Sequence, residues 1–479
     1  MSGSVLVPAD DGYAAACTGF NLAVVPRPDA VLVARDEADV AAGVRFARDT
    51  GLAIRVIATG HGAAPVPDGG LLINVSGLDS VSVEPFARTA TVGGGAPWRE
   101  VVAQAAPHGL APITGSSAGV GAVGFLLGGG LGPLSRHFGV GSDQLVSARI
   151  VTGSGEVVTA SADENPDLFW ALRGGKSGLG IVTSATVRLV EVAELYGGAL
   201  LFDANDARAV LTGWLAWGAD ADARITTSVA VMRFPDLDEV PPPLRGRHLV
   251  SVRFAAPVDA ASGEQLAAPL RALAPVYLDA LGPLPIAEIA KVHSDPDGPL
   301  PGWMRGIMLG ELDERFVDAL LGLVGAGTES PFLGVEVRQL GGAVADPSGD
   351  SAMGGRENPF TLSVIGAPNP ALFATVLPGA FAGLRARLGE WIAPTTTINW
   401  LGESEDPTEY RSAWSPAAFA RLAEVRRRYD PSGCSRSGRR RREAQASAAS
   451  SASSARSASS VSPARRSPVV GPATASAAA

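Results

Sequence analysis

Residues 115–132 read GSSAGVGAVGFLLGGGLG, so eight of eighteen positions are glycine. Glycine at this density is unsuited to the interior of a helix or sheet, because its backbone loses more freedom on folding than that of any other residue. A flexible linker is the alternative, but such linkers lack apolar side chains, and Phe125, Leu126 and Leu127 interrupt this run. The run therefore predicts a loop that wraps closely around a large flat or anionic ligand.

The same region is the best candidate for a membrane span, since residues 118–135 carry no charge. It is shorter than the roughly 20 residues that a span needs, and it is rich in glycine. Residues 1–11 lack the positive and apolar regions of a signal peptide. We therefore expect a cytoplasmic protein without a membrane partner.

Length and charge narrow the class of protein. A chain of 479 residues with 46% hydrophobic residues is long enough for two or three domains. Residues 435–479 form a basic Ser/Ala/Arg tail that we expect to be disordered. The remaining body is strongly acidic, which argues against nucleic acid as a partner. Cys17 and Cys434 alone supply neither a disulfide framework nor a zinc site, so no metal is expected.

Strand and helix signals alternate over the first part of the chain. Residues 30–35 and 53–58 are predicted strands, and residues 36–49 are a predicted helix between them. From about residue 192 helical and strand segments mix differently, which predicts a second α+β domain. A helix over 417–429 follows near the end.

Two further segments carry possible binding chemistry. The loop TGHG, residues 59–62, directly follows a predicted strand, and its glycines let backbone N–H groups approach a ligand. Taken alone, a loop histidine is more often an ordinary surface residue. Residues 167–183, DLFWALRGGKSGLGIVT, lead from an amphipathic turn through a glycine-rich bend into a strand. An ordinary helix–turn–strand connection has the same pattern.

Together these segments resemble the covalent FAD-linked oxidases of the berberine-bridge-enzyme-like family, within the vanillyl-alcohol-oxidase (PCMH-type) fold. The family's histidine loop is similar to ATGHG, its glycine stretch to VGAVGFLLGGGLG, and its DLFWALRGGGGNFGVVT motif to residues 167–183. Its late Y-x-N-[FY] motif resembles TINW at residues 397–400, and its closing YDP matches residues 429–431. The resemblance covers about residues 26–434.

The resemblance implies an α+β fold with a two-part PCMH-type FAD-binding domain and an α+β substrate-binding domain. The first would comprise residues 1–194 and a return segment over 395–434, and the second residues 195–394. It also implies a small-molecule substrate and FAD bonded covalently through His61. The implied cofactor contacts are Thr59, Gly60, His61, Gly62, Ser116, Ser117, Val120, Gly121, Gly124, Gly129, Gly130, Gly180, Ile181, Val182 and Asn399.

The chain also departs from the family pattern. Ser117 aligns with a cysteine that forms a second flavin bond in many members, so only one bond is expected. Lys176 stands in a bend that is all glycine in the family motif. Thr397 replaces a tyrosine that helps to deprotonate the substrate in some members, so the motif does not supply the proton acceptor. Val120 aligns with a family position where small residues accompany reactivity with molecular oxygen, which favours an oxidase.

Three residues are candidates for catalysis. Asn399 belongs to the late motif. Glu336 and Arg338 lie two apart on a predicted strand and so share one face, and Glu336 would be a base if that face looked at the flavin. The alternative is a surface ion pair. His293 lies among turn residues, where a histidine is usually solvated, and is the third candidate.

The leading hypothesis is an FAD-dependent oxidase that takes a hydride from an alcohol, sugar, amine or secondary metabolite. The alternatives are a flavin dehydrogenase with another electron acceptor, and a flavin- or ligand-binding protein without turnover. A nicotinamide enzyme needs G-x-G-x-x-G after the first strand of its fold, and the residues after 30–35 here are DEADVA. No motif identifies the substrate, because its contacts would come from the middle domain.

Overall fold

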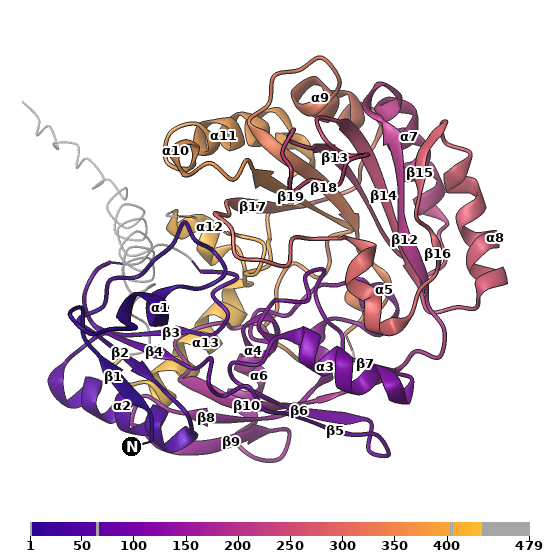
Figure 1. Ribbon diagram of the computed structural model, residues 1–479. Coiled ribbons are helices and arrows are strands. Elements are labelled where there is room, and N and C mark those ends of the chain that lie inside the picture. Colours follow the sequence, from indigo (N-terminus) through magenta and orange to yellow (C-terminus); the bar gives the residue numbers. More distant parts are fainter. Residues whose placement is uncertain (1, 64–66, 348, 403, 405, 434–479) are drawn as a thin grey trace, which may run out of the picture.

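The computed structural model describes residues 2–433 apart from 64–66, 348, 403 and 405. The fold is α+β, as expected, and Figure 1 shows it in two halves, each built on its own sheets. The last two helices, α12 (Pro407–Arg411) and α13 (Pro416–Tyr429), return to the half that contains the N-terminal strands. The tail expected to be disordered, residues 435–479, lies outside the described residues.

A four-stranded sheet with the order β1-β2-β4-β3 opens the structure. Its strands are β1 (Ser4–Leu6), β2 (Ala30–Val33), β3 (Ile54–Ile57) and β4 (Leu71–Asn74), and the short helix α1 (Tyr13–Cys17) precedes β2. Helix α2 (Glu37–Thr50) joins β2 to β3; Asp36 caps its start, and Gly51 ends it with a φ of 71°. The predicted strands and helix of this region are confirmed. Strand β3 leads directly into the histidine loop.

A five-stranded antiparallel sheet lies beside the first, in the order β5-β6-β10-β8-β9. Its strands are β5 (Val81–Glu84), β6 (Thr89–Gly93), β8 (Leu145–Val151), β9 (Val157–Ser161) and β10 (Ile181–Arg188). Helices α3 (Trp98–Ala105), α4 (Ala122–Leu126), α5 (Ser135–Phe138) and α6 (Pro166–Leu172) belong to the same half. The glycine-rich run is not entirely loop, because its apolar centre forms α4 and buries Ala122 and Leu126 in the core.

The other half is an eight-stranded sheet in the order β15-β12-β14-β13-β18-β19-β17, with β16 also paired to β12. Its strands are β12 (Tyr196–Asp203), β13 (Thr226–Arg233), β14 (His248–Ala256), β15 (Val276–Asp279), β16 (Gly282–Pro283), β17 (Met304–Leu309), β18 (Phe332–Gln339) and β19 (Phe360–Gly366). Its helices are α7 (Ala207–Ala219), α8 (Ala260–Arg271), α9 (Glu314–Val324), α10 (Pro370–Phe373) and α11 (Leu377–Arg387). Alternate residues of the central strands, such as Val335 and Val337, form one core with these helices.

Short elements complete the fold. Strands β7 (Leu110–Ala111) and β11 (Val190–Glu191) form a two-stranded sheet between the halves. The 3-10 helices are η1 (Ala106–His108), η2 (Gly141–Gln144), η3 (Ala204–Asp206), η4 (Ile286–Val292), η5 (Gly342–Val344) and η6 (Gly389–Trp391). Within the described part of the chain, no helix combines the length and the apolar character needed to cross a membrane.

The return segment shares a core with the second sheet. Ile398, Leu401, Trp414 and Leu422 pack with residues of β6, β8 and β10 in one buried cluster. We therefore propose to keep the domain boundaries inferred from the sequence, with residues 1–194 and 395–434 in one domain and 195–394 in the other.

A buried ion pair connects the two halves. Arg356, in the connection between β18 and β19, donates two hydrogen bonds of 2.7 Å to the carboxylate of Asp143 in η2. Both side chains are buried, and Arg356 Nε also donates to the carbonyl of Val344. A bidentate pair of this kind fixes one orientation, and it is costly to break because the remaining charge stays buried.

We expect Arg356→Met to lower the free energy of unfolding by about 3–5 kcal/mol, because it leaves Asp143 charged and buried. Chemical denaturation followed by fluorescence measures this change. Arg208→Met is the control, since its ion pairs lie on the exposed surface of α7 and should change stability by less than about 1 kcal/mol. Equal effects of the two substitutions would contradict a structural role for the buried pair.

Candidate active site

The histidine loop is held by a close crossing of two backbone segments. Gly60 has a φ of 69°, and a Cβ atom there would lie only 2.7 Å from the Cα of Gly19. Phe20 N donates to the carbonyl of Thr59 (2.8 Å), while Phe20 accepts a hydrogen bond from Leu300 N of the other half (3.0 Å). The loop is therefore fixed by both halves of the molecule.

His61 stands in this loop with an unused nitrogen. Its Nδ1 atom is buried and has no hydrogen-bond partner, and its ring lies 4.2 Å from the ring of Phe20, centroid to centroid. Burial lowers the pKa of His61, and the charge of Asp295 only partly opposes this. The imidazole is therefore neutral near pH 7 and has a lone pair available to a ligand. Nothing lies within 4 Å of a Cβ placed at Gly62, so the loop is open beside the ring.

The glycine-rich run lies against this loop at one end. Gly121 N donates to Thr59 Oγ1 at 3.2 Å, and Gly124 has open space where a side chain would stand. Ser117 is buried, with its hydroxyl unpartnered. Open glycines in the two segments, together with unpartnered buried polar atoms at His61 Nδ1 and Ser117 Oγ, fit a large cofactor that approaches the backbone.

Other predicted cofactor contacts have packing roles. A side chain at Gly129 would collide with Met353, and one at Gly130 with Phe125, so these glycines let the chain pack on itself. The side chains of Ile181 and Val182 are buried in cores, so they can reach a cofactor only through backbone groups. Two further predicted contacts adjoin these residues. Ser116 precedes Ser117 in the chain. Gly180 precedes Ile181; its φ is 121°, and a side chain there would collide with the carbonyl of Val151.

Asn399 joins the return segment to the glycine-rich run. Its Nδ2 donates to the carbonyl of Phe125 (3.0 Å), and its Oδ1 accepts from Lys176 Nζ (2.7 Å). Lys176 Nζ also donates to the carbonyl of Gly124 (2.8 Å). Asn399 is thus held against the glycine-rich run by Lys176, a residue that no motif predicts to be functional. The sequence signal that could have indicated a role for Lys176 is its position in a bend where the family motif has glycine.

Glu336 and His293 meet in one buried cluster on the face of the eight-stranded sheet opposite the helices. Glu336 Oε1 accepts from Arg253 Nη1 (2.8 Å) and Ser228 Oγ (2.6 Å), and it lies 3.4 Å from His293 Nε2. Glu336 Oε2 lies 3.1 Å from Arg338 Nη2. The alternatives of a surface ion pair and a solvated histidine are therefore wrong, since all these side chains are at most 10% exposed.

The charges of this cluster decide what each group can do. Burial alone would raise the pKa of Glu336, but Arg338 and Arg253 outweigh it and hold the pKa well below its usual range. Burial, together with Arg338, lowers the pKa of His293. Glu336 is therefore a firmly ionised carboxylate and a weak base, whereas His293 is a neutral imidazole.

The return motif TINW connects this cluster with the loops. The ring of Trp400 lies 5.3 Å from the guanidinium carbon of Arg338, a cation–π arrangement, while its neighbour Asn399 contacts Lys176. Thr397, which replaces the family tyrosine, is 1% exposed and its hydroxyl has no hydrogen-bond partner. One short segment thus brings the glycine-rich loops and the polar sheet face together.

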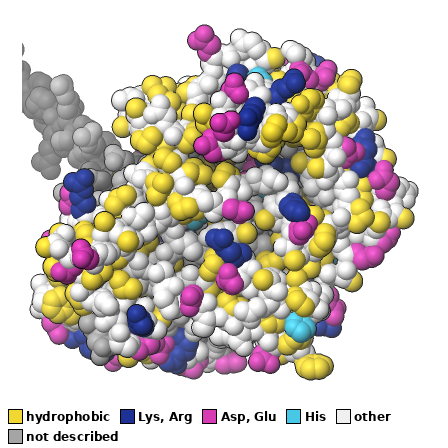
Figure 2. All heavy atoms as spheres, viewed as in Figure 1, with side chains coloured by type: hydrophobic (Ala, Val, Ile, Leu, Met, Phe, Trp, Pro, Cys, Tyr) yellow, Lys and Arg dark blue, Asp and Glu magenta, His cyan; other side chains and the backbone are white. Residues whose placement is uncertain are grey.

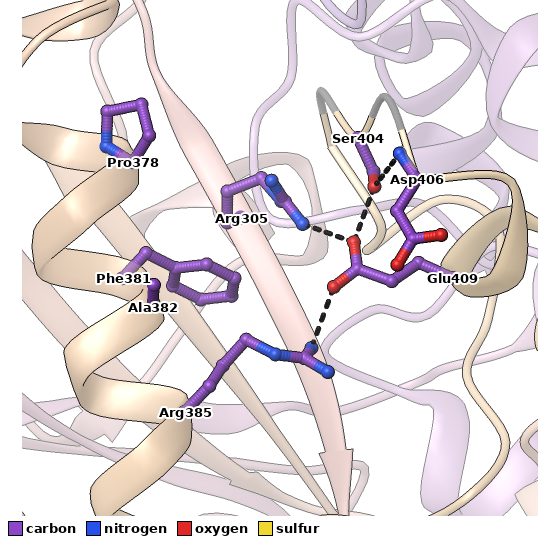
Figure 3. Close-up of a pocket in the computed structure, with 8 residues that line it drawn as sticks. All are labelled: Arg305, Pro378, Phe381, Ala382, Arg385, Ser404, Asp406 and Glu409. Carbon is purple, nitrogen blue, oxygen red and sulfur yellow. Dashed lines mark hydrogen bonds and ion pairs between the residues drawn. The ribbon is translucent and has the colours of Figure 1, made fainter.

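A separate hollow of about 330 Å³ lies between α11 and α12, as Figure 3 shows. Glu409 pairs there with Arg305 (2.5 Å) and Arg385 (3.2 Å) and accepts a hydrogen bond from Ser404. None of the residues predicted to act in catalysis or cofactor binding lines it. We interpret it as a contact between the return segment and the edge of the eight-stranded sheet.

Comparisons with known proteins indicate the class of protein. A family model described as an FAD binding domain matches residues 28–161. The (R)-6-hydroxynicotine oxidase of Paenarthrobacter nicotinovorans is 29% identical over 443 residues, which cover 90% of this chain and 94% of that protein. The structure of BBE-like 1 from Physcomitrella patens has a TM-score of 0.78 at 20% identity and covers 91% of this chain and 96% of its own.

A glucooligosaccharide oxidase from Acremonium strictum, whose structure is described with a 6-S-cysteinyl, 8α-N1-histidyl FAD, has a TM-score of 0.76 at 19% identity. It covers 90% of this chain and 95% of its own. Fold and site together define an FAD-dependent oxidoreductase. Residues 28–161 match an FAD binding domain, and over about nine-tenths of its length the chain is similar to FAD-linked oxidases and has their vanillyl-alcohol-oxidase, or PCMH-type, fold.

The lowered pKa of His293 has a consequence for stability. The unfolded chain takes up a proton near pH 6.5 and the folded chain only at lower pH, so the free energy of unfolding should fall as pH drops below about 6.5. His293→Gln should flatten this dependence, by at most about 1.4 kcal/mol per pH unit for one proton. Denaturant titrations between pH 8 and 5 measure it. His108→Gln, at an exposed position, is the control, and an unchanged slope in His293→Gln would contradict the assignment.

Proposed function

We propose that this protein is an oxidase that holds FAD covalently through His61 and oxidises a small molecule with molecular oxygen as the acceptor. The single observation that supports it most is the neutral, half-buried His61, with its Nδ1 unpartnered in a loop between open glycines. A histidyl flavin is also named for the Acremonium strictum enzyme with the same fold.

FAD bound here would supply the hydride acceptor. The chain's own residues would provide the rest of the site. Thr59, Gly62, Gly121 and Gly124 would let the backbone approach the cofactor, and Asn399 would hold it from the return segment, oriented by Lys176 and the carbonyl of Phe125. The remaining predicted contacts would act mainly through their backbone.

The polar sheet face would receive the substrate. His293, a neutral imidazole, is the candidate for handling a proton, which would replace the contact of its Nε2 with Arg338, whereas Glu336 is held ionised by two arginines. We therefore assign Glu336 the role of positioning Arg253 and Arg338. The relatives support a substrate among amines, sugars or secondary metabolites, with alcohols also within the proposal. The cytoplasmic location stays a prediction.

We propose no nucleic-acid partner, as expected from the acidic charge of the chain before residue 435. On the face shown in Figure 2, acidic and basic side chains are interspersed, and the basic ones do not gather into a stripe.

A screen of alcohols, sugars and amines for anaerobic bleaching of the flavin tests the proposed activity. Bleaching by none of these classes would favour a flavin-binding protein without turnover.

The covalent bond can be tested directly. After acid precipitation, the wild-type pellet should stay yellow, and its band on a denaturing gel should fluoresce. His61→Ala should release all its FAD into the supernatant, because no other residue is proposed to bond the flavin. His108→Ala, at an exposed position, is the control. A colourless wild-type pellet would refute the bond without refuting FAD binding.

Reaction with oxygen is a separate prediction and depends on Val120. This side chain is partly buried against the core of the second sheet, close to Gly121 and Gly124. Val120→Leu should slow reoxidation of the flavin by air-saturated buffer at least tenfold, with little change in reduction by substrate. Stopped-flow absorbance measures both steps, and Val158→Leu, packed on the same core from β9, is the control. Reoxidation of the wild type over many minutes, with fast turnover by an artificial acceptor, would instead indicate a dehydrogenase.

A further inference from the structure

The cluster around Glu336 carries more positive than negative charge. Arg253 and Arg338 are 8% and 3% exposed, and Glu336, the carboxylate that they share, is 7% exposed. His293 completes the cluster as a neutral ring. The described ion pairs give the two guanidinium groups no second carboxylate. One positive charge is therefore left without a counter-ion, in surroundings where an unpaired charge is costly.

The unpartnered polar atoms of this cluster are donors. His293 Nε2 lies 3.0 Å from Arg338 Nη2 and 3.4 Å from Glu336 Oε1. The contact with Arg338 is the shorter, and a guanidinium can only donate, so we assign Nε2 as the acceptor. The proton of the neutral ring is therefore assigned to Nδ1, which is buried without a partner. Arg338 Nε is likewise a buried donor without a partner. An excess of charge and an excess of donors both call for a ligand with anionic oxygen.

The cluster opens on a narrow crevice that faces the cofactor-binding half. Pro133, from the end of the glycine-rich region, lines it together with Thr226, Ser228, Arg253, His293 and Arg338. Trp400 of the return segment lies against the guanidinium of Arg338. As it stands the crevice has no room for a water molecule, so a single functional group of a ligand would enter only as the surrounding side chains move apart.

We propose that this crevice is a subsite for an acidic group of the substrate, a carboxylate or an ionised hydroxyl, held by Arg338, Arg253 and the Nδ1–H of His293. The inference rests on the proposed function, because it makes the oxidised molecule an acid. Glu336 positions both guanidinium groups and neutralises one of them, so the subsite has a net charge of one rather than two. Charge-assisted bonds to a carboxylate are stronger than those to a neutral amide of the same shape.

The matched probes benzoate and benzamide test the charge of the ligand at pH 7. Binding is followed in the flavin-loaded protein by the flavin absorbance spectrum and by tryptophan fluorescence. We expect a dissociation constant for benzoate at least tenfold lower than that for benzamide. Equal constants, with the flavin present, would overturn the subsite while leaving the oxidase proposal intact. A chain that binds no flavin would refute the oxidase proposal, and tryptophan fluorescence would still measure the two probes.

Two substitutions change the charge of the subsite in opposite directions. Arg338→Gln should weaken benzoate binding at least tenfold and leave benzamide unchanged, and Arg338→Lys should restore part of the loss. Glu336→Gln should tighten benzoate binding, because it raises the net charge. Arg208→Gln, which removes the same charge from the exposed face of α7, should change neither constant.

The anion held by this cluster could instead be the reduced flavin. The same variants distinguish a substrate anion from the flavin anion. If Arg338→Gln lowers the flavin reduction potential but leaves the benzoate constant unchanged, the substrate subsite is refuted. If Arg338→Gln fails to fold, Glu336→Gln alone decides, since weaker benzoate binding in that variant would also overturn the proposal.

Discussion

The backbone crossing of Gly19 and Gly60 is the constraint on which the rest of the site depends. A side chain at either position would collide with the other segment, so the histidine loop has one path and His61 is set against Phe20. The hydrogen bond from Gly121 N to Thr59 Oγ1 then ties the glycine-rich run to that path. The orientation of a single imidazole is thus determined by backbone geometry more than by its own contacts.

On the polar face of the eight-stranded sheet, the side chains are held in place by ion pairs rather than by backbone geometry. One carboxylate is shared by two guanidinium groups, and it also accepts hydrogen bonds from the hydroxyls of Ser228 and Ser363. Trp400 and Asn399, neighbours in the chain, contact Arg338 and Lys176 respectively. If a cofactor binds at the loops and a substrate at the sheet, Asn399 and Trp400 would therefore fix the position of one relative to the other.

Much of this could be predicted from the sequence where the signal is local. The strands and helix around the histidine loop follow from capping and periodicity, and period two places Glu336 and Arg338 on one face. The meeting of Glu336 with His293 and Arg253 could not be predicted, because strand pairing brings together residues far apart in the chain. Likewise, a glycine motif does not reveal which positions face a ligand and which face Met353 or Phe125. Only long-range packing decides that.

The return segment also sets an order of events during biogenesis. Residues 397–400 and the helix α13 follow the whole eight-stranded sheet in the chain, yet their partners lie in the half that is synthesised first. The nascent N-terminal half therefore emerges with part of its own core still missing. If Asn399 holds FAD as proposed, that contact can form only after the return segment has been synthesised.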